Sequence, residues 1–197
     1  SGADWLPTLW EWAGGDAAAL PPDLDGGSLA PALRALGAGG PGRPLPPIDR
    51  GGELVTHSPH YVLTADGWKN QRPSSAIYDG RWKLVAWYET GEILLYDLAA
   101  DPSESADVGD ARPAVRRDLW VRLRDYLAAV DAKLPTLDPA HPANPGGEGD
   151  ADADGLPDDW EFATLLSARF DGTSDPDADG ASNADEYAAG SDPLTAP

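Results

Sequence analysis

The sequence contains no cysteine, no methionine, few basic residues and no long apolar run. The absence of cysteine excludes disulfides, zinc thiolate sites and cysteine nucleophiles. With 14 basic and 34 acidic residues, the formal charge is −20. This disfavours nucleic acid and anionic membrane surfaces as partners, because both are bound by clustered Lys and Arg. No segment approaches the roughly 18 apolar residues of a membrane span. Without methionine there is no ordinary translation start, so we expect a fragment or processed product.

Acidic residues gather towards the C-terminus. Residues 138–197 hold 15 acids and one base, a net charge of −14, whereas residues 1–137 have a net charge of −6. The stretch 138–149 is rich in Pro and Gly, which is typical of a linker. We therefore predict a globular region over 1–137, a linker over 138–149 and a small acidic module over 150–197.

The globular region has the pattern of an α+β fold. Strand-like runs are predicted over 53–57, 74–80, 82–90 and 92–98. The last three are joined by turns at Asp79–Gly80 and Thr90–Gly91, which favours an antiparallel meander. Shorter helices are expected over 5–15, capped by Asp4, and near 29–36.

A longer helix is predicted over 112–132. Its apolar side chains recur every three or four residues and form one stripe, at Val115, Leu119, Leu123, Tyr126 or Leu127, and Val130. A four-stranded antiparallel sheet with this C-terminal helix packed on it buries both apolar surfaces. We expect four aromatic residues to belong to that core: Trp82, Trp87, Tyr88 and Trp120.

Two segments of the acidic module match the calcium-loop pattern D-x-[DN]-x-[DN]-G-x5-E, namely loop 1 over 150–161 and loop 2 over 175–186. The pattern supplies side-chain oxygens at positions one, three, five, nine and twelve and a backbone carbonyl at position seven. The predicted ligands are Asp150, Asp152, Asp154, Leu156, Asp158 and Glu161 in loop 1, and Asp175, Asp177, Asp179, Ala181, Asn183 and Glu186 in loop 2.

Calcium takes six to eight oxygens, and carboxylates this close repel one another without a cation. We therefore predict two structural calcium sites and a loose module in the absence of the ion, rather than a merely solvated acidic tail. Pro and Gly precede loop 1, and Pro176 lies within loop 2. These residues disfavour the paired helix-loop-helix geometry of a calcium sensor.

The phrases DGLPDDWE and NADEYAAGSDP resemble the dockerin-like and thrombospondin-like EF-hand calcium repeats that end many secreted bacterial proteins. The resemblance covers about residues 148–193. It implies an exported protein, extracellular or periplasmic, in which this module serves as a spacer, anchor or docking element.

Several runs in the globular region occur in the order found in the C-terminal part of sulfatases. They are DWLPTLWEWAG (4–14), LDGGSLAPAL (24–33), THSPHY (56–61), SAIYDGRWKL (75–84) and LYDLAADPSE (95–104). Together they resemble arylsulfatase-type enzymes of the alkaline-phosphatase-like superfamily. That resemblance implies a four-stranded sheet with a helix, packed beside a larger α/β domain and helping to wall its substrate pocket.

The same resemblance implies what the chain lacks. The nucleophile of that family is the Cys or Ser of C/S-x-P-x-R, matured to formylglycine, and no such motif occurs here. The parent would be a sulfuric ester hydrolase acting on a sulfated glycan or aryl sulfate. Its nucleophile and one catalytic calcium would lie in a missing N-terminal domain. We therefore expect this chain to be inactive alone.

Four residues are candidates for contact with a sulfated substrate. His57 and His60 lie three apart at the end of a predicted strand, and Lys69 and Arg72 lie in a predicted loop. An imidazole can hydrogen-bond a hydroxyl or sulfate oxygen, and a cation can pair with sulfate. The alternative is structural: a histidine bonded to the backbone beneath the strand, and a solvated loop.

Two other functions remain open. The chain is alternatively a non-catalytic calcium-binding module that anchors or spaces an assembly, because only its calcium motifs are complete. It is otherwise part of a sister enzyme of the same superfamily, a phosphodiesterase or phosphonate hydrolase.

Overall fold

The computed structural model describes residues 2–22, 24–39, 46, 48–50, 53–63, 69–138, 146 and 149–196. The chain forms two compact units, Ser1–Leu54 and Val55–Pro197. Most of the predicted linker over 138–149 lies outside the described residues. Within the described ranges, every helix is too short or too polar to cross a bilayer.

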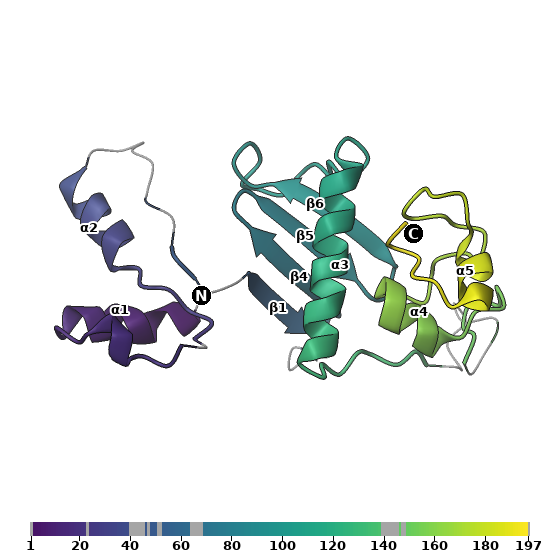
Figure 1. Cartoon of the computed structure of the whole chain (residues 1–197), viewed down its shortest axis with the longest axis horizontal. Helices are drawn as coiled ribbons and strands as arrows, with labels where there is room; N and C mark the ends of the chain where they lie inside the picture. Colours follow the sequence, from purple (N-terminus) through teal and green to yellow (C-terminus); the bar gives the residue numbers. More distant parts are fainter. Residues whose placement is uncertain are drawn as a thin grey trace. The chain divides into compact units, whose positions relative to one another are not determined.

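The first unit is built from short helices (Figure 1). They are η1 (Gly2–Asp4), α1 (Trp5–Trp12), η2 (Ala17–Ala19) and α2 (Ala30–Ala38). The two helices predicted here are therefore present as α1 and α2, the first of them shorter than expected. Helix α1 leaves large apolar side chains exposed, including Trp5, Leu6, Leu9 and Trp12.

Asp4 does not cap α1 with its side chain, so that part of the prediction was wrong. Its buried carboxylate instead accepts hydrogen bonds from the Gly27 amide at 3.0 Å and from Arg50 at 2.7 and 3.0 Å. Burial opposes ionisation, but the Arg50 ion pair and these hydrogen bonds hold the pKa of Asp4 well below its usual range. The Arg50 guanidinium gives each of the two Asp4 carboxylate oxygens a hydrogen bond, which a local cap of the helix would not do.

The second unit contains a four-stranded antiparallel sheet with the strand order β1-β4-β5-β6. Its strands are β1 (Leu54–Ser58), β4 (Ser74–Asp79), β5 (Trp82–Trp87) and β6 (Glu92–Asp97). The last three form the predicted meander, and their register aligns Ile77, Leu84 and Leu95, all fully buried. Gly80 and Gly91 have φ of +57° and +72° in the two turns, a conformation that glycine adopts without strain.

A second sheet was not predicted. It pairs β2 (Val62–Leu63) with β3 (Lys69–Gln71) in antiparallel fashion. Lys69 therefore belongs to a strand rather than to the expected loop. Strands of two and three residues are too short to show a readable alternation of apolar and polar positions.

Helix α3 (Pro113–Ala129) lies across one face of the sheet and contacts β4, β5 and β6 (Figure 1). The predicted stripe is largely confirmed, because Leu119, Leu123 and Leu127 are buried. It ends at Leu127 rather than Tyr126. Val130 follows the helix and is 53% exposed, so that expectation was wrong. Among the four aromatic residues expected in the core, Tyr88 and Trp120 are buried, and Trp82 and Trp87 are partly buried.

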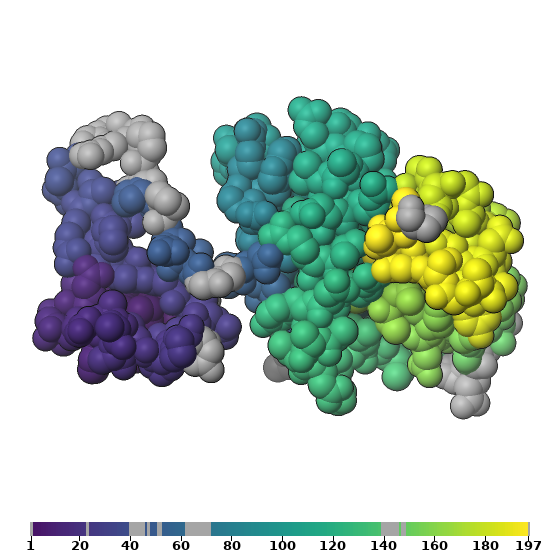
Figure 2. Space-filling model, viewed as in Figure 1, coloured from purple at the N-terminus to yellow at the C-terminus, as the bar shows by residue number. Residues whose placement is uncertain are grey.

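The acidic module packs directly on this sheet and helix, as Figure 2 shows in yellow and light green. It contains α4 (Asp158–Leu165) and α5 (Asn183–Ala189), neither of which was predicted. Phe162 and Leu165 belong to the same buried cluster as Tyr88, and Trp120 Nε1 donates to the Leu165 carbonyl at 3.0 Å. The division of the chain after Leu54 accordingly leaves the acidic module in the same compact unit as the sheet.

Candidate metal centre

Each predicted calcium loop gathers three aspartates. One carboxylate oxygen from each lies within 4.8 Å of the others, in two groups: Asp150, Asp152 and Asp154, and Asp175, Asp177 and Asp179. At position six, Gly155 and Gly180 have φ of +94° and +99°. Their amides donate to the position-one aspartates at 3.2 and 3.0 Å. The two loops, which share the same spacing of Asp and Gly in the sequence, therefore have the same local backbone geometry.

The exiting helices bring the position-twelve glutamates inward. Helices α4 and α5 both begin at position nine of their loops, so Glu161 and Glu186 fall in the first turn. Their side chains are 0% and 1% exposed. In the described part of the chain, neither carboxylate oxygen of Glu161 has a hydrogen-bond partner of acceptable geometry, and Glu186 Oε2 has none either. Buried carboxylates in native proteins are paired or bind a cation, because an isolated buried charge is costly.

Further oxygens of the predicted ligand set are buried without partners. They are Asp152 Oδ1, Asp154 Oδ2, Asp177 Oδ2 and Asn183 Oδ1, among the residues that the structure describes. Asp158, at position nine of loop 1, is different because its Oδ1 accepts from the Ala151 amide at 2.8 Å. The position-seven residues, Leu156 and Ala181, donate their amides to the position-five aspartates at 2.8 and 2.7 Å.

Burial and neighbouring negative charges dominate the electrostatics of these loops. Burial, reinforced by the charges of Asp152 and Asp154, raises the pKa of Glu161 to about 9, against a small opposing contribution from the Phe170 amide. The pKa is also raised, with burial as the largest cause, at three further carboxyls: Asp152, Asp177 and Glu186. A cation among these oxygens would reverse the shifts, because it favours the ionised form.

The donor set fits a hard divalent cation. All side-chain donors are carboxylate or amide oxygens, and neither sulfur nor imidazole takes part. Oxygen-only sites of this kind suit calcium or magnesium. The buried oxygens without partners are the observation that separates these loops from an ordinary acidic surface.

His57 has a protein partner at each ring nitrogen. Nε2 lies 3.1 Å from the Lys133 carbonyl oxygen, which only accepts, so in the neutral ring Nδ1 accepts from Ser75 Oγ at 2.6 Å. Ser75 in turn accepts from the Tyr88 hydroxyl at 2.7 Å. Burial raises the pKa of Tyr88 to about 12, which keeps it a donor at neutral pH. This network was not predicted, since Ser75 lies 18 residues from His57. It corresponds to the structural reading of His57, and the substrate-binding role stays a prediction.

The other substrate candidates do not share this network. His60 is exposed beyond the end of β1. The Arg72 guanidinium lies 4.4 Å from the centroid of the Trp87 ring, in a cation–π contact. The side chain of Lys69 lies outside the described residues. Substrate binding by these residues stays a prediction.

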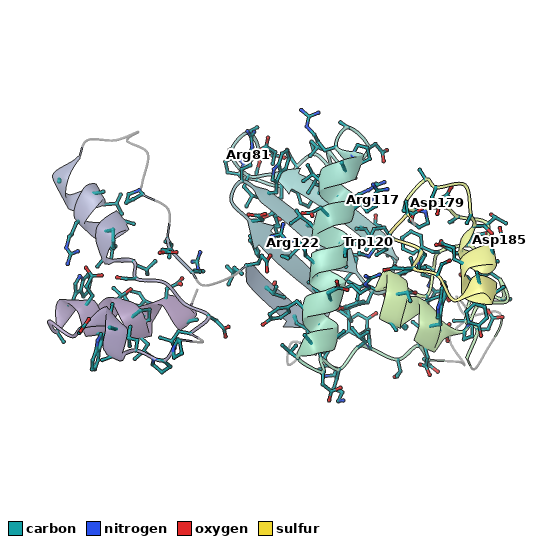
Figure 3. All side chains as sticks on the ribbon, viewed as in Figure 1. Arg81, Arg117, Trp120, Arg122, Asp179 and Asp185 are labelled. Carbon is teal, nitrogen blue, oxygen red and sulfur yellow. The ribbon has the colours of Figure 1, made fainter. Side chains whose placement is uncertain are left out.

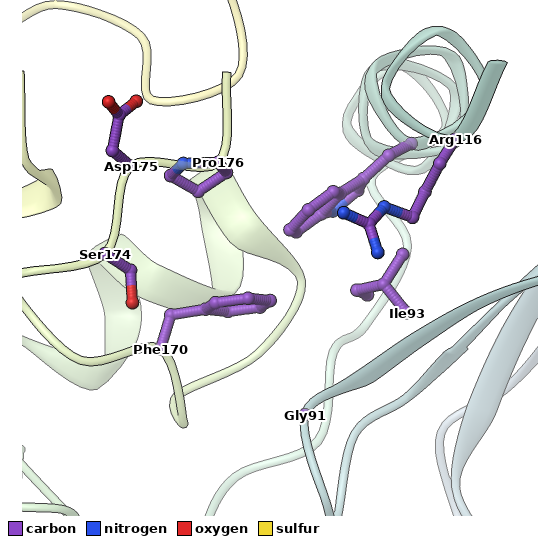
Figure 4. Close-up of a pocket in the computed structure, with 8 residues that line it drawn as sticks. Gly91, Ile93, Arg116, Phe170, Ser174, Asp175 and Pro176 are labelled. Atoms are coloured by element: carbon purple, nitrogen blue, oxygen red, sulfur yellow. The ribbon is translucent and has the colours of Figure 1, made fainter. Parts of the chain in front are cut away.

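A cavity of about 210 Å³ separates α3 from the start of loop 2 (Figure 4). It is lined by Gly91, Ile93, Arg116, Trp120, Phe170, Ser174, Asp175 and Pro176. Asp175, the position-one aspartate, lies at one side and Arg116 at the other. Trp120 and Phe170 pack with their ring centroids 5.1 Å apart. The Trp120 and Phe170 rings therefore join the sheet region to the acidic module, and the cavity lies next to them at the start of loop 2.

No family model matches the chain. Among solved structures, a putative sulfatase from Bacteroides thetaiotaomicron is 22% identical, with a TM-score of 0.44, over 66% of this chain and 25% of that protein. A protein solved with its substrate D-glucosamine-2-N,6-O-disulfate is 21% identical, with a TM-score of 0.43, over 67% and 24%. The phosphonate monoester hydrolase of Agrobacterium radiobacter is 28% identical, with a TM-score of 0.33, over 66% and 24%.

This chain spans about a quarter of the length of each of these proteins. All three TM-scores lie below 0.5. Any functional assignment therefore rests on the residues of this chain.

Proposed function

We propose that this chain is a calcium-binding part of a larger sulfatase, and that its own contribution is to bind one structural calcium ion in each of loops 1 and 2. The observation that carries the calcium proposal is the burial of Glu161 and Glu186: among the described residues, both carboxylate oxygens of Glu161 and Oε2 of Glu186 have no hydrogen-bond partner. The other donors would be the predicted ligands at positions one, three, five, seven and nine. Bound calcium would supply positive charge that neutralises the clustered carboxylates.

The calcium proposal is tested by titrating the full chain with calcium in a calorimeter. We expect two sites with dissociation constants of about 10⁻⁴ to 10⁻³ M, the range of extracellular calcium modules. Glu161→Gln should abolish the loop 1 site because it removes the ionised, two-oxygen donor. The matched control is Asp159→Asn, which removes one negative charge from the same helical turn at an exposed position. Equal loss in both variants would mean that net charge, not coordination, attracts the ion.

The sulfatase part of the proposal has separate support. Five runs of the sequence occur in the order of a sulfatase C-terminal region, and the sheet and helix expected of it are present. Helix α1 also exposes Trp5 and Trp12 by about half. Such apolar exposure suits a segment that is covered in a larger protein. The parent would be secreted and would act on a sulfated glycan or aryl sulfate.

This part is tested by reading the coding DNA upstream of Ser1. An open frame that runs into a C/S-x-P-x-R motif would support the missing N-terminal domain, with its formylglycine nucleophile and catalytic calcium. A start codon close before Ser1 would instead favour the alternative, a non-catalytic calcium module for anchoring or docking. Hydrolysis of an aryl sulfate by the purified chain alone would contradict the proposal that the catalytic residues lie elsewhere.

A further inference from the structure

Helix α3 reaches across to loop 2 and its surroundings through arginine side chains. Arg124 Nη1 pairs with Asp192 at 2.6 Å, after the end of α5. Arg117 Nη1 donates a hydrogen bond to the backbone carbonyl of Asp177, which is position three of loop 2. Figure 3 shows Arg117 on the side of α3 that faces this loop. A residue 60 positions earlier in the chain thus contacts the metal loop directly.

Arg117 contacts the backbone carbonyl of Asp177, so the carboxylate of Asp177 does not pair with Arg117 and is available to bind a cation. Asp177 is only 4% exposed, and its Oδ2 has no hydrogen-bond partner among the described residues. The next residue, Ala178, has φ of +63°, a left-handed conformation that is disfavoured for residues other than glycine. Arg117 therefore contacts the loop backbone at a buried ligand, one residue before this left-handed position.

Charge alone would make Arg117 harmful to a cation site. A guanidinium beside the loop repels calcium, so on Coulomb's law its removal should tighten binding. If its hydrogen bond fixes the loop in the binding geometry, removal should weaken binding, because the loop must then be ordered by the ion itself. The two mechanisms predict opposite signs, which makes the role of Arg117 measurable.

We infer that Arg117 is a positioning residue for calcium in loop 2, so that this site is completed by helix α3 of the sheet region. The inference rests on the proposed calcium binding. It makes the second site dependent on the folded sheet, rather than a property of the acidic segment alone. Loop 1 serves as the internal reference, because Arg117 contacts loop 2.

The test is a calcium titration of the full chain followed by NMR. The amides of Gly155 and Gly180 donate to the position-one aspartates, so each reports on its own loop. We expect Arg117→Gln to raise the calcium midpoint at Gly180 about tenfold, the effect of losing one hydrogen bond from a charged donor. The midpoint at Gly155 should not change. Arg117→Lys, which keeps a charged donor, should recover most of the loss.

The matched control is Arg116→Gln. Arg116 lies across the cavity from Asp175 (Figure 4) and pairs with Asp110 at 3.1 Å. Its removal deletes the same charge near loop 2 without deleting the bond to Asp177, so the Gly180 midpoint should stay the same or tighten. An unchanged or tighter Gly180 midpoint in Arg117→Gln would overturn the inference. Absence of any calcium response at Gly155 and Gly180 in the unaltered chain would instead refute the proposed function.

A second measurement needs no variant and applies even if Arg117→Gln fails to fold. In the unaltered chain, the guanidinium NMR signals of Arg117 should shift with the Gly180 midpoint. If the calcium midpoints at Gly155 and Gly180 differ, the Arg117 signals should change at the Gly180 midpoint and not at the Gly155 midpoint. Signals that do not respond while Gly180 titrates would overturn the inference.

Discussion

At the scale of single residues, Gly26 and Gly27 have the closest backbone neighbours among the described glycines of the first unit. A Cβ on Gly26 would lie 2.1 Å from the Ala3 carbonyl oxygen, and one on Gly27 would lie 2.0 Å from that of Asp49. Backbone atoms cannot yield as a flexible side chain can. The sequence showed two glycines in a sulfatase-like run, but the reason for them, close approach of distant backbone, becomes visible only in three dimensions.

We therefore predict that Gly26→Ala destabilises the first unit by about 1–3 kcal/mol, the usual cost of overpacking. Gly37→Ala is the matched control, because nothing lies within 4 Å of its Cβ and the residue is inside α2. It should stabilise the helix by up to about 1 kcal/mol. Urea unfolding of both variants checks the prediction, and equal midpoints would contradict it.

Asp4 gives the first unit a dependence on acid pH. Its pKa is lower in the folded chain than in the unfolded chain, because Arg50 and the Gly27 amide favour the ionised form. A depressed pKa contributes stability above the unfolded value of about 3.9, and this stability is lost as the pH falls further. We predict that, in the unaltered chain, the urea concentration at the unfolding midpoint decreases as the pH is lowered below about 4. In Asp4→Asn it should be lower at neutral pH and depend less on acid. Parallel pH profiles would show that other carboxyls are responsible.

At the scale of elements, α4 is the link between loop 1 and the sheet. Phe162 of α4 is 5% exposed, and its ring centroid lies 6.3 Å from that of Tyr88, which follows β5. We predict that Phe162→Ala lowers the stability of the second unit by about 3–5 kcal/mol, as is usual for an aromatic residue removed from a core. Tyr187→Ala in α5, where the side chain is 43% exposed, should cost much less. Similar losses in thermal unfolding would contradict the assignment of Phe162 to the shared core.

The elements also show which parts of the structure can be predicted from sequence. The meander and α3 were predictable because alternation, glycine turns and a three-four apolar repeat are local signals. Helices α4 and α5 were missed because each is short and begins inside a predicted calcium loop, at position nine, where the pattern predicts ligands. Segments this short are stabilised by the loops and the core they join, not by their own pattern.

The candidate metal site divides in the same way. The twelve predicted ligands follow from spacing within two short segments, and the structure gathers the six aspartates at positions one, three and five. The contact of Arg117 with loop 2 could not be predicted, because it joins residues 60 apart through the packing of two elements. The hydrogen bonds of His57 to Ser75 and Lys133 are long-range for the same reason.

At the scale of the whole molecule, the acidic module and the sheet share one hydrophobic core. Binding that is confined to the folded state stabilises by RT ln(1 + [L]/Kd), about 2.7 kcal/mol per site at a hundredfold excess over Kd. Calcium added well above its dissociation constant should therefore raise the melting temperature of the second unit by about 5–15 °C. We expect this rise to extend to the sheet rather than to be confined to the loops.

The measurement is thermal unfolding of the full chain in calcium and in chelator, followed at the NMR signals of Trp120 and Tyr88. Both residues belong to the sheet and helix but contact the acidic module. Their signals should disappear at a higher temperature in calcium, in the same transition as Gly155 and Gly180. Magnesium is the control cation, because it demands a smaller and more regular site. If the loops were stabilised while Trp120 and Tyr88 melted at an unchanged temperature, the acidic module would be an independent appendage, and calcium would act on it alone.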